Sequence, residues 1–104
     1  MIAHLLVMYP QPKDPAAFER AYKEEHLPYA GPRLIGATGL VSKRVAPAGG
    51  DRPPYHAISD VSFPSLKALQ ACADSRGGKE ALAHAASIST GGPPAIMILT
   101  DDLA

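Results

Sequence analysis

The sequence predicts an α+β domain in which a four-stranded antiparallel sheet carries two helices on one face. Three observations support this prediction. The chain has 104 residues, enough for one hydrophobic core and too few for two. Its glycines and prolines fall in clusters between segments with strand-like or helix-like patterns. These segments follow the order strand, helix, strand, strand, helix, strand, which is the split βαβ arrangement of a ferredoxin-like fold.

Four segments are predicted to be strands, because each is rich in apolar and β-favouring residues and is bounded by proline, glycine or polar residues. They cover residues 2–9, 37–46, 55–63 and 95–100. Pro10 stops the first strand abruptly. The stretch from Pro47 to Pro54 is expected to be a mobile connection between the second strand and the third.

Two segments are predicted to be helices. They cover residues 16–27 and 66–87, the second with an interruption at 75–78. Asp14 supplies a side-chain cap for the first helix, and Pro15 has the backbone angle of a first helical turn. Pro28 disfavours helical geometry at Leu27, so the first helix is predicted to end there.

Composition narrows the choice of partners. Ten basic residues balance ten acidic ones, which argues against binding to nucleic acid or to a membrane surface. The longest apolar run, residues 5–8, is too short to span a bilayer, and no signal peptide is visible, so a cytoplasmic location is expected. Two helices cover only one face of a four-stranded sheet, so the other face is predicted to pack in a homodimer.

The sequence predicts no cofactor and no metal. Cys72 is the only cysteine; no zinc-site spacing or dinucleotide fingerprint is present. No basic group that would activate the Cys72 thiol is evident, so a small buried residue is expected there. The turn at 89–92 lacks the flanking strand and helix of a phosphate site.

Phe18, Tyr22 and His26 lie four residues apart and are predicted to form one stripe on the first helix. The stripe runs from an apolar ring through a phenol to an imidazole that titrates near neutral pH. Such a gradient suits the wall of a pocket. The alternative is that Phe18 and Tyr22 are ordinary core residues and that His26 caps the helix end, where the helix dipole favours its protonated form.

Three further polar side chains, His4, Tyr9 and Asp60, have two interpretations each, and His84 has one. His4 stands among apolar residues of the first strand, where it either makes a fixed hydrogen bond in the core or dimer interface, or lines the pocket. Tyr9 is either at the pocket mouth or a packed rim residue. Asp60 is expected to be solvated, although it has the chemistry to orient a histidine. His84 has alanines around it and no identifiable partner, and is expected on the surface.

Several residues, taken in order, resemble the EthD family. They are Val7-Met8-Tyr9-Pro10, Asp14-Pro15, Phe18, Tyr22, His26-Leu27-Pro28, Tyr55, Phe63-Pro64-Ser65-Leu66 and Thr90-Gly91-Gly92. The resemblance spans nearly the whole chain and implies one EthD-like domain over residues 1–104, assembled as a dimeric α+β barrel. The family is named after a component of bacterial ethyl tert-butyl ether degradation, which implies a small hydrophobic oxygen-containing metabolite as ligand and a role in a degradation pathway.

Two groups of related enzymes extend the resemblance to single residues. A methylmuconolactone methylisomerase uses a histidine at the position that matches His26. Small polyketide cyclases are similar and carry a first-strand histidine at the position of His4. Their second catalytic histidine is replaced near Gly78 in this chain and a nearby tyrosine by Cys72, which is a departure from the cyclase pattern.

The residue pattern and the family resemblance together predict cofactor-independent acid/base chemistry. The predicted catalytic residues are His26 and Tyr22; the predicted substrate-binding residues are His4, Tyr9, Phe18 and Tyr55. One alternative is a non-catalytic binding module that supports a partner oxygenase. The other is a cofactor-free monooxygenase.

Overall fold

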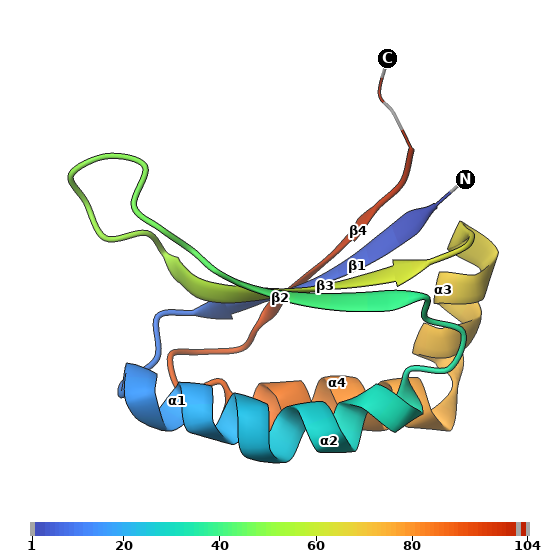
Figure 1. Cartoon of the computed structure of the whole chain (residues 1–104), viewed down its shortest axis with the longest axis horizontal. Helices are drawn as coiled ribbons and strands as arrows, with labels where there is room; N and C mark the ends of the chain where they lie inside the picture. Colours follow the sequence, from blue (N-terminus) through green and yellow to red (C-terminus); the bar gives the residue numbers. More distant parts are fainter. Residues whose placement is uncertain (1, 102, 104) are drawn as a thin grey trace.

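Four antiparallel strands form one sheet in the order β2-β3-β1-β4. The computed structural model describes residues 2–101 and 103. The strands are β1 (Ala3–Pro10), β2 (Gly39–Arg44), β3 (Tyr55–Phe63) and β4 (Ala95–Leu99). All helices lie on the same face of the sheet (Figure 1). The predicted fold class is therefore confirmed, with β3 at its predicted bounds and β2 shorter at both ends.

The first helical segment is longer than predicted. It consists of α1 (Pro15–Ala21), a π-helical turn η1 (Tyr22–His26), α2 (Leu27–Ala30) and a 3₁₀ turn η2 (Gly31–Arg33). The predicted cap is present, since the Asp14 side chain accepts a hydrogen bond from the Ala17 backbone N–H at 3.2 Å. The predicted end at Leu27 is wrong, because Pro28 falls in the first turn of α2, where its missing N–H is not needed.

The second helical region is split by a single residue. Helices α3 (Leu66–Asp74) and α4 (Arg76–Ile88) meet at Ser75, whose hydroxyl accepts a hydrogen bond from the Gly78 N–H at 3.0 Å. The predicted interruption over 75–78 is therefore too wide. A Cβ atom at Gly78 would lie 1.9 Å from the carbonyl oxygen of Cys72, so the position where related cyclases were expected to carry histidine holds no side chain.

The core lies between the helices and one face of the sheet. Along β1, Ala3, Leu5, Val7 and Tyr9 are buried beneath the helices, whereas the residues between them are partly exposed. Two clusters fill this layer. One consists of Ala3, Leu5, Val61, Phe63, Leu69 and Cys72; the other consists of Val7, Tyr9, Phe18, Tyr22, Ala85 and Ile88.

The opposite face of the sheet, here called the open face, is not covered by the described residues. The strand registers place on it His4, Leu6 and Met8 of β1, Val41 of β2, Asp60 and Ser62 of β3, and Met97 and Leu99 of β4. Val41 and Met97 are each 52% exposed. The uncovered apolar face on which the predicted homodimer depends is therefore present.

Candidate functional site

The predicted stripe on the first helical segment is present. Phe18, Tyr22 and His26 are all buried, with ring centroids 6.0 Å apart for the first pair and 5.6 Å for the second. Tyr9 of β1 packs against this stripe, 5.0 Å from the Phe18 ring and 5.8 Å from the Tyr22 ring. The π-helical turn η1 therefore keeps Tyr22 and His26 on the side of the helix that meets the sheet, and such turns recur at functional sites.

A hydroxyl cluster joins this helix to the sheet. The Tyr22 hydroxyl is hydrogen-bonded to Ser42 Oγ of β2 at 2.5 Å and to Ser59 Oγ of β3 at 2.6 Å. Within residues 2–101 and 103, the Tyr9 hydroxyl is buried without a hydrogen bond of good geometry. Burial raises the pKa of Tyr9, and the neighbouring Tyr22 adds to the rise, while the nearby Ser59 hydroxyl opposes it. The Tyr9 phenol is therefore protonated at neutral pH.

His26 is paired with a second histidine. Its Nδ1 atom lies 2.9 Å from Nδ1 of His84, and the two rings are nearly parallel. The prediction of an unpartnered surface position for His84 is therefore wrong. Burial lowers the pKa of His26 to about 4, and the nearby His84 adds to the effect. His26 is neutral at pH 7, and since the helical segment continues beyond it, the charged helix-end cap does not describe it.

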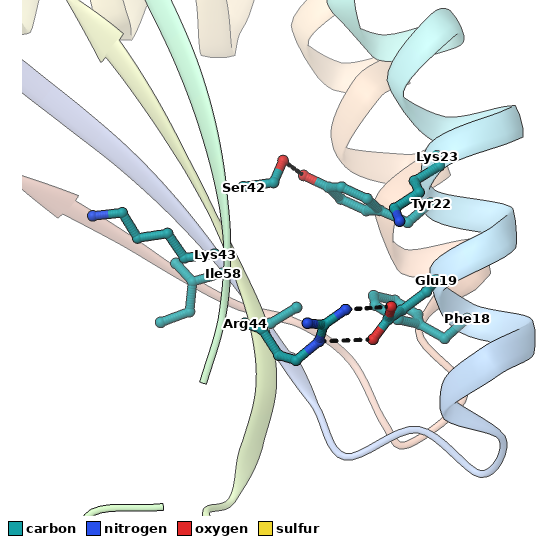
Figure 2. A pocket seen from close by; sticks show the side chains of 9 residues that line it. Phe18, Glu19, Tyr22, Lys23, Ser42, Lys43, Arg44 and Ile58 are labelled. Carbon is teal, nitrogen blue, oxygen red and sulfur yellow. Dashed lines mark hydrogen bonds and ion pairs between the residues drawn. The ribbon is translucent and has the colours of Figure 1, made fainter. Parts of the chain in front are cut away.

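The outer cavity opens between α1 and β2 and has a volume of about 170 Å³. Its lining comprises Phe18, Glu19, Tyr22, Lys23, Ser42, Lys43, Arg44, Ala57 and Ile58. Figure 2 shows Ser42 and Arg44 reaching from β2 toward Tyr22 and Glu19 on the helix, whereas the Lys43 side chain points away. Aromatic and apolar groups thus form the interior, and charged groups form the rim.

The inner cavity lies deeper between the helices and the sheet and has a volume of only about 20 Å³. His26 and Ser59 line it together with apolar residues of β1, β3 and α4. Tyr22 lines the outer cavity and is hydrogen-bonded to Ser59, which lines the inner one. The Tyr22 hydroxyl cluster therefore lies between the two cavities.

Glu19 organises the rim of the outer cavity. It accepts hydrogen bonds from Arg44 at 2.6 and 3.1 Å and from His56 Nε2 at 2.9 Å. Arg44 and then His56 lower the pKa of Glu19 to about 2. His56 lies at the point where the register between β1 and β3 shifts. A bulge turns a side chain away from its alternating position, and His56 accordingly reaches the helix layer.

His4 and Tyr55 are not brought to this site. His4 lies on the open face, where its Nδ1 donates to Asp60 Oδ1 at 2.7 Å. The expectation that Asp60 is merely solvated is therefore wrong, because it orients His4. Tyr55 lines neither cavity and uses its carbonyl oxygen to accept a hydrogen bond from Gln11.

Sequence reasoning missed Ser42, Ser59 and His84. Ser59 had a signal, since it is a hydroxyl residue on the same alternating face as Val61 and Phe63. His84 had a weaker one, because the alanines before and after it allow α4 to approach the first helical segment closely. Ser42 lies on a strand whose residues are mostly exposed, and its sequence context carried no signal.

Neither a metal centre nor a membrane span emerges from the described part of the chain. Over residues 2–101 and 103, His, Cys, Asp and Glu side chains do not gather in groups of three or more that would hold a metal ion. No helix in the same residues is long and apolar enough to cross a membrane.

Comparison with known proteins shows the fold. No family model and no curated protein sequence matches the chain. An EthD family protein from Bacillus halodurans has a similar structure, with a TM-score of 0.86 at 20% identity over 98% of this chain and 100% of that one. A dimeric ferredoxin-like protein of unknown function from Jannaschia gives 0.66 at 18% identity over 96% and 98%. The cofactor-independent oxygenase SnoaB from Streptomyces nogalater gives 0.60 at 13% identity over 99% and 94%. The resemblance to the EthD family is thus confirmed in the fold.

Proposed function

We propose that the chain binds a small hydrophobic molecule that carries a hydroxyl or carbonyl oxygen, and that it transforms this molecule by cofactor-independent acid/base chemistry. The observation that carries the proposal is His26, a buried histidine that stays neutral at pH 7 and lies beside the Tyr22 hydroxyl cluster. A neutral imidazole has a lone pair available to accept a proton. Its Nδ1 is engaged by His84, so Nε2 is the nitrogen that acts on the ligand.

Tyr22 acts as hydrogen-bond donor in this proposal. Its hydroxyl is held by Ser42 and Ser59, which is the arrangement expected of a preorganised donor for a ligand oxygen. Phe18 provides apolar surface beside it in the outer cavity, and Tyr9, which lines neither cavity, packs behind Phe18. Donation to a carbonyl oxygen makes the adjacent C–H more acidic, and that proton is the one a neighbouring base removes.

The two cavities form one binding site when the hydroxyl cluster opens. Pockets for drug-sized ligands span about 300–1,000 Å³, so the outer cavity of about 170 Å³ suits a smaller molecule. The inner cavity of about 20 Å³ has room for about one water. A ligand oxygen that replaces Ser59 as the partner of Tyr22 keeps the Tyr22 hydroxyl hydrogen-bonded and extends the site inward to His26.

We further propose that the functional unit is a homodimer formed through the open face. Leu6, Met8, Val41, Met97 and Leu99 give that face an apolar surface. Burial of such a surface is the main driving force of association. The Jannaschia protein, similar in fold, is described as dimeric. Sedimentation velocity at micromolar concentration should give a dimer of about twice 10.9 kDa; a stable monomer would contradict this assembly.

A second candidate is a cofactor-free monooxygenase, which is favoured by the similarity in fold to SnoaB, a cofactor-independent oxygenase. In that case the same base removes a proton from a quinol-like substrate, which then reacts with O₂. The third possibility is a binding module for a partner oxygenase, which uses the same site without chemistry of its own. An oxygen electrode with naphthohydroquinone as probe separates the second candidate, because only the oxygenase consumes O₂ above the rate of autoxidation.

Deuterium exchange tests the leading proposal without knowledge of the natural substrate. The protein is incubated in D₂O with a panel of small cyclic ketones and lactones, and deuterium uptake at the carbon next to the carbonyl is followed by NMR. The wild type should accelerate uptake for at least one compound, and His26→Ala should lose about 10²- to 10⁴-fold of that rate.

A matched control is His4→Gln, which removes an imidazole from the open face, keeps a hydrogen-bonding side chain there and should leave the exchange rate unchanged. Ligand binding without exchange would favour the binding module. Exchange that survives in His26→Ala would refute the role of His26.

A further inference from the structure

The second histidine of the buried pair is not explained by packing alone. His84 is half-buried on α4, and its Nδ1 approaches Nδ1 of His26 from η1 at 2.9 Å. At this distance one of the two nitrogens must carry a proton and the other must accept it. The pair therefore shares a single proton along the Nδ1–Nδ1 line, and the position of that proton decides the tautomer of His26.

A stack of side chains holds His84 in this position. The His26 ring lies on one side with its centroid 5.1 Å away and its plane tilted by 11°. The Tyr29 ring of α2 stacks on His84 at 4.6 Å, and the Arg33 guanidinium lies 3.6 Å from the Tyr29 ring centroid. Arg33 is also paired with Glu80, one turn before His84 on α4. These aromatic and charged groups fix the His84 ring between the buried His26 and the surface.

We propose that His84 is the positioning residue of His26 and relays protons between it and solvent. The inference rests on the proposed acid/base function and assigns the residue that completes it. The step begins with His26 in the tautomer that has its proton on Nδ1 and a lone pair on Nε2. Nε2 takes a proton from the ligand while the Nδ1 proton passes to Nδ1 of His84. One N–H bond forms at each of these two atoms, one breaks at His26 Nδ1, and the ligand keeps the electron pair.

The relay leaves His26 neutral throughout. Its surroundings oppose a positive charge, since burial and the neighbouring imidazole both disfavour the protonated form. The positive charge instead forms on His84, which is more exposed and can return the proton to water. The reverse sequence delivers a proton to the ligand, so the same pair serves as base and as acid.

Nitrogen-15 NMR of the imidazole rings tests the relay without substrate. Protonated His84 has a proton on both nitrogens, so its Nδ1 must donate and His26 must hold its own proton on Nε2. On acidification, the wild-type His26 signals should shift to those of the Nε2–H tautomer. In His84→Gln the amide can still hydrogen-bond to His26 but takes up no proton, so the pH response of His26 should be lost.

The titratable and charged groups around the pair, Tyr22, Tyr29, Arg33 and Glu80, are unchanged in His84→Gln, so they serve as an internal control for local charge. His26 signals that do not respond to pH in the wild type, or that respond equally in the variant, would overturn the relay. If His84→Gln does not fold, the test is instead the scalar coupling across the hydrogen bond between the two Nδ1 nuclei in the wild type. Observed coupling supports the shared proton of the pair, and its absence overturns the proposal. Neither readout needs turnover, so failure here is distinct from failure of the deuterium-exchange test of His26.

Discussion

The buried neutral His26 makes stability depend on pH in a predictable window. Its pKa is about 4 in the folded chain and about 6.5 when unfolded. Between these values the unfolded state binds more protons, so stability is full above pH 6.5 and falls as the pH drops toward 4. At pH 5 the unfolded imidazole is almost fully protonated and the folded one about a tenth protonated, so linkage gives a loss of about 2 kcal/mol relative to pH 8.

Urea unfolding at pH 8 and pH 5 measures this difference, with the protein concentration held fixed because an oligomer would make stability concentration-dependent. In His26→Leu the difference between the two pH values should shrink by about 2 kcal/mol. The matched control His4→Gln should keep the wild-type difference. Glu19 adds little between these two pH values, because its pKa falls from 4.5 to about 2 on folding and its contribution to stability is lost mainly below pH 5. An equal pH response in wild type and His26→Leu would refute the reasoning.

Three further predictions concern the packing around the site. Gly78→Ala places a Cβ against a backbone carbonyl and should lower the free energy of unfolding in urea by more than about 2 kcal/mol. In the control Gly49→Ala the new Cβ meets nothing within 4 Å, so the change should stay within about 0.5 kcal/mol. Equal effects of the two substitutions would contradict the close approach of α3 and α4. Tyr22→Phe leaves the Ser59 hydroxyl without its Tyr22 partner and should destabilise by about 1–3 kcal/mol in the same assay; a neutral result would show that the hydroxyl cluster contributes nothing. Met97→Lys on the open face should shift sedimentation toward monomer, and an unchanged dimer would place the interface elsewhere.

The sheet was predictable because its signals are local. The apolar strands, the prolines between them and the element order sufficed, and the stripe of Phe18, Tyr22 and His26 followed from helical spacing. The continuation of the helix past Leu27 was not predictable from Pro28. Proline disfavours helical geometry in the residue before it, but it is tolerated in the first turn of a helix, and the sequence does not show which case applies here. The π-helical turn that precedes Pro28 has no simple sequence pattern.

The partners of the polar side chains were not predictable, because they come from distant parts of the chain. His26 and His84 are 58 residues apart, and His4 and Asp60 are 56 apart. Which face of β1 carries His4 is decided by which face the helices cover, and alternation does not contain that information. The predicted pocket that combined His4 with His26 therefore separates into a site beneath the helices and a pair on the open face.

The most direct test of a ligand site between the first helical segment and the sheet is chemical-shift mapping with small oxygen-bearing probes. Proton–nitrogen NMR spectra are recorded with 1-naphthol and with cyclohexanone as probes. We expect the largest backbone shifts at Tyr22, His26, Ser42 and Ser59, and we expect His26→Ala to weaken them. Shifts confined to the open face around His4 and Leu6 would contradict it.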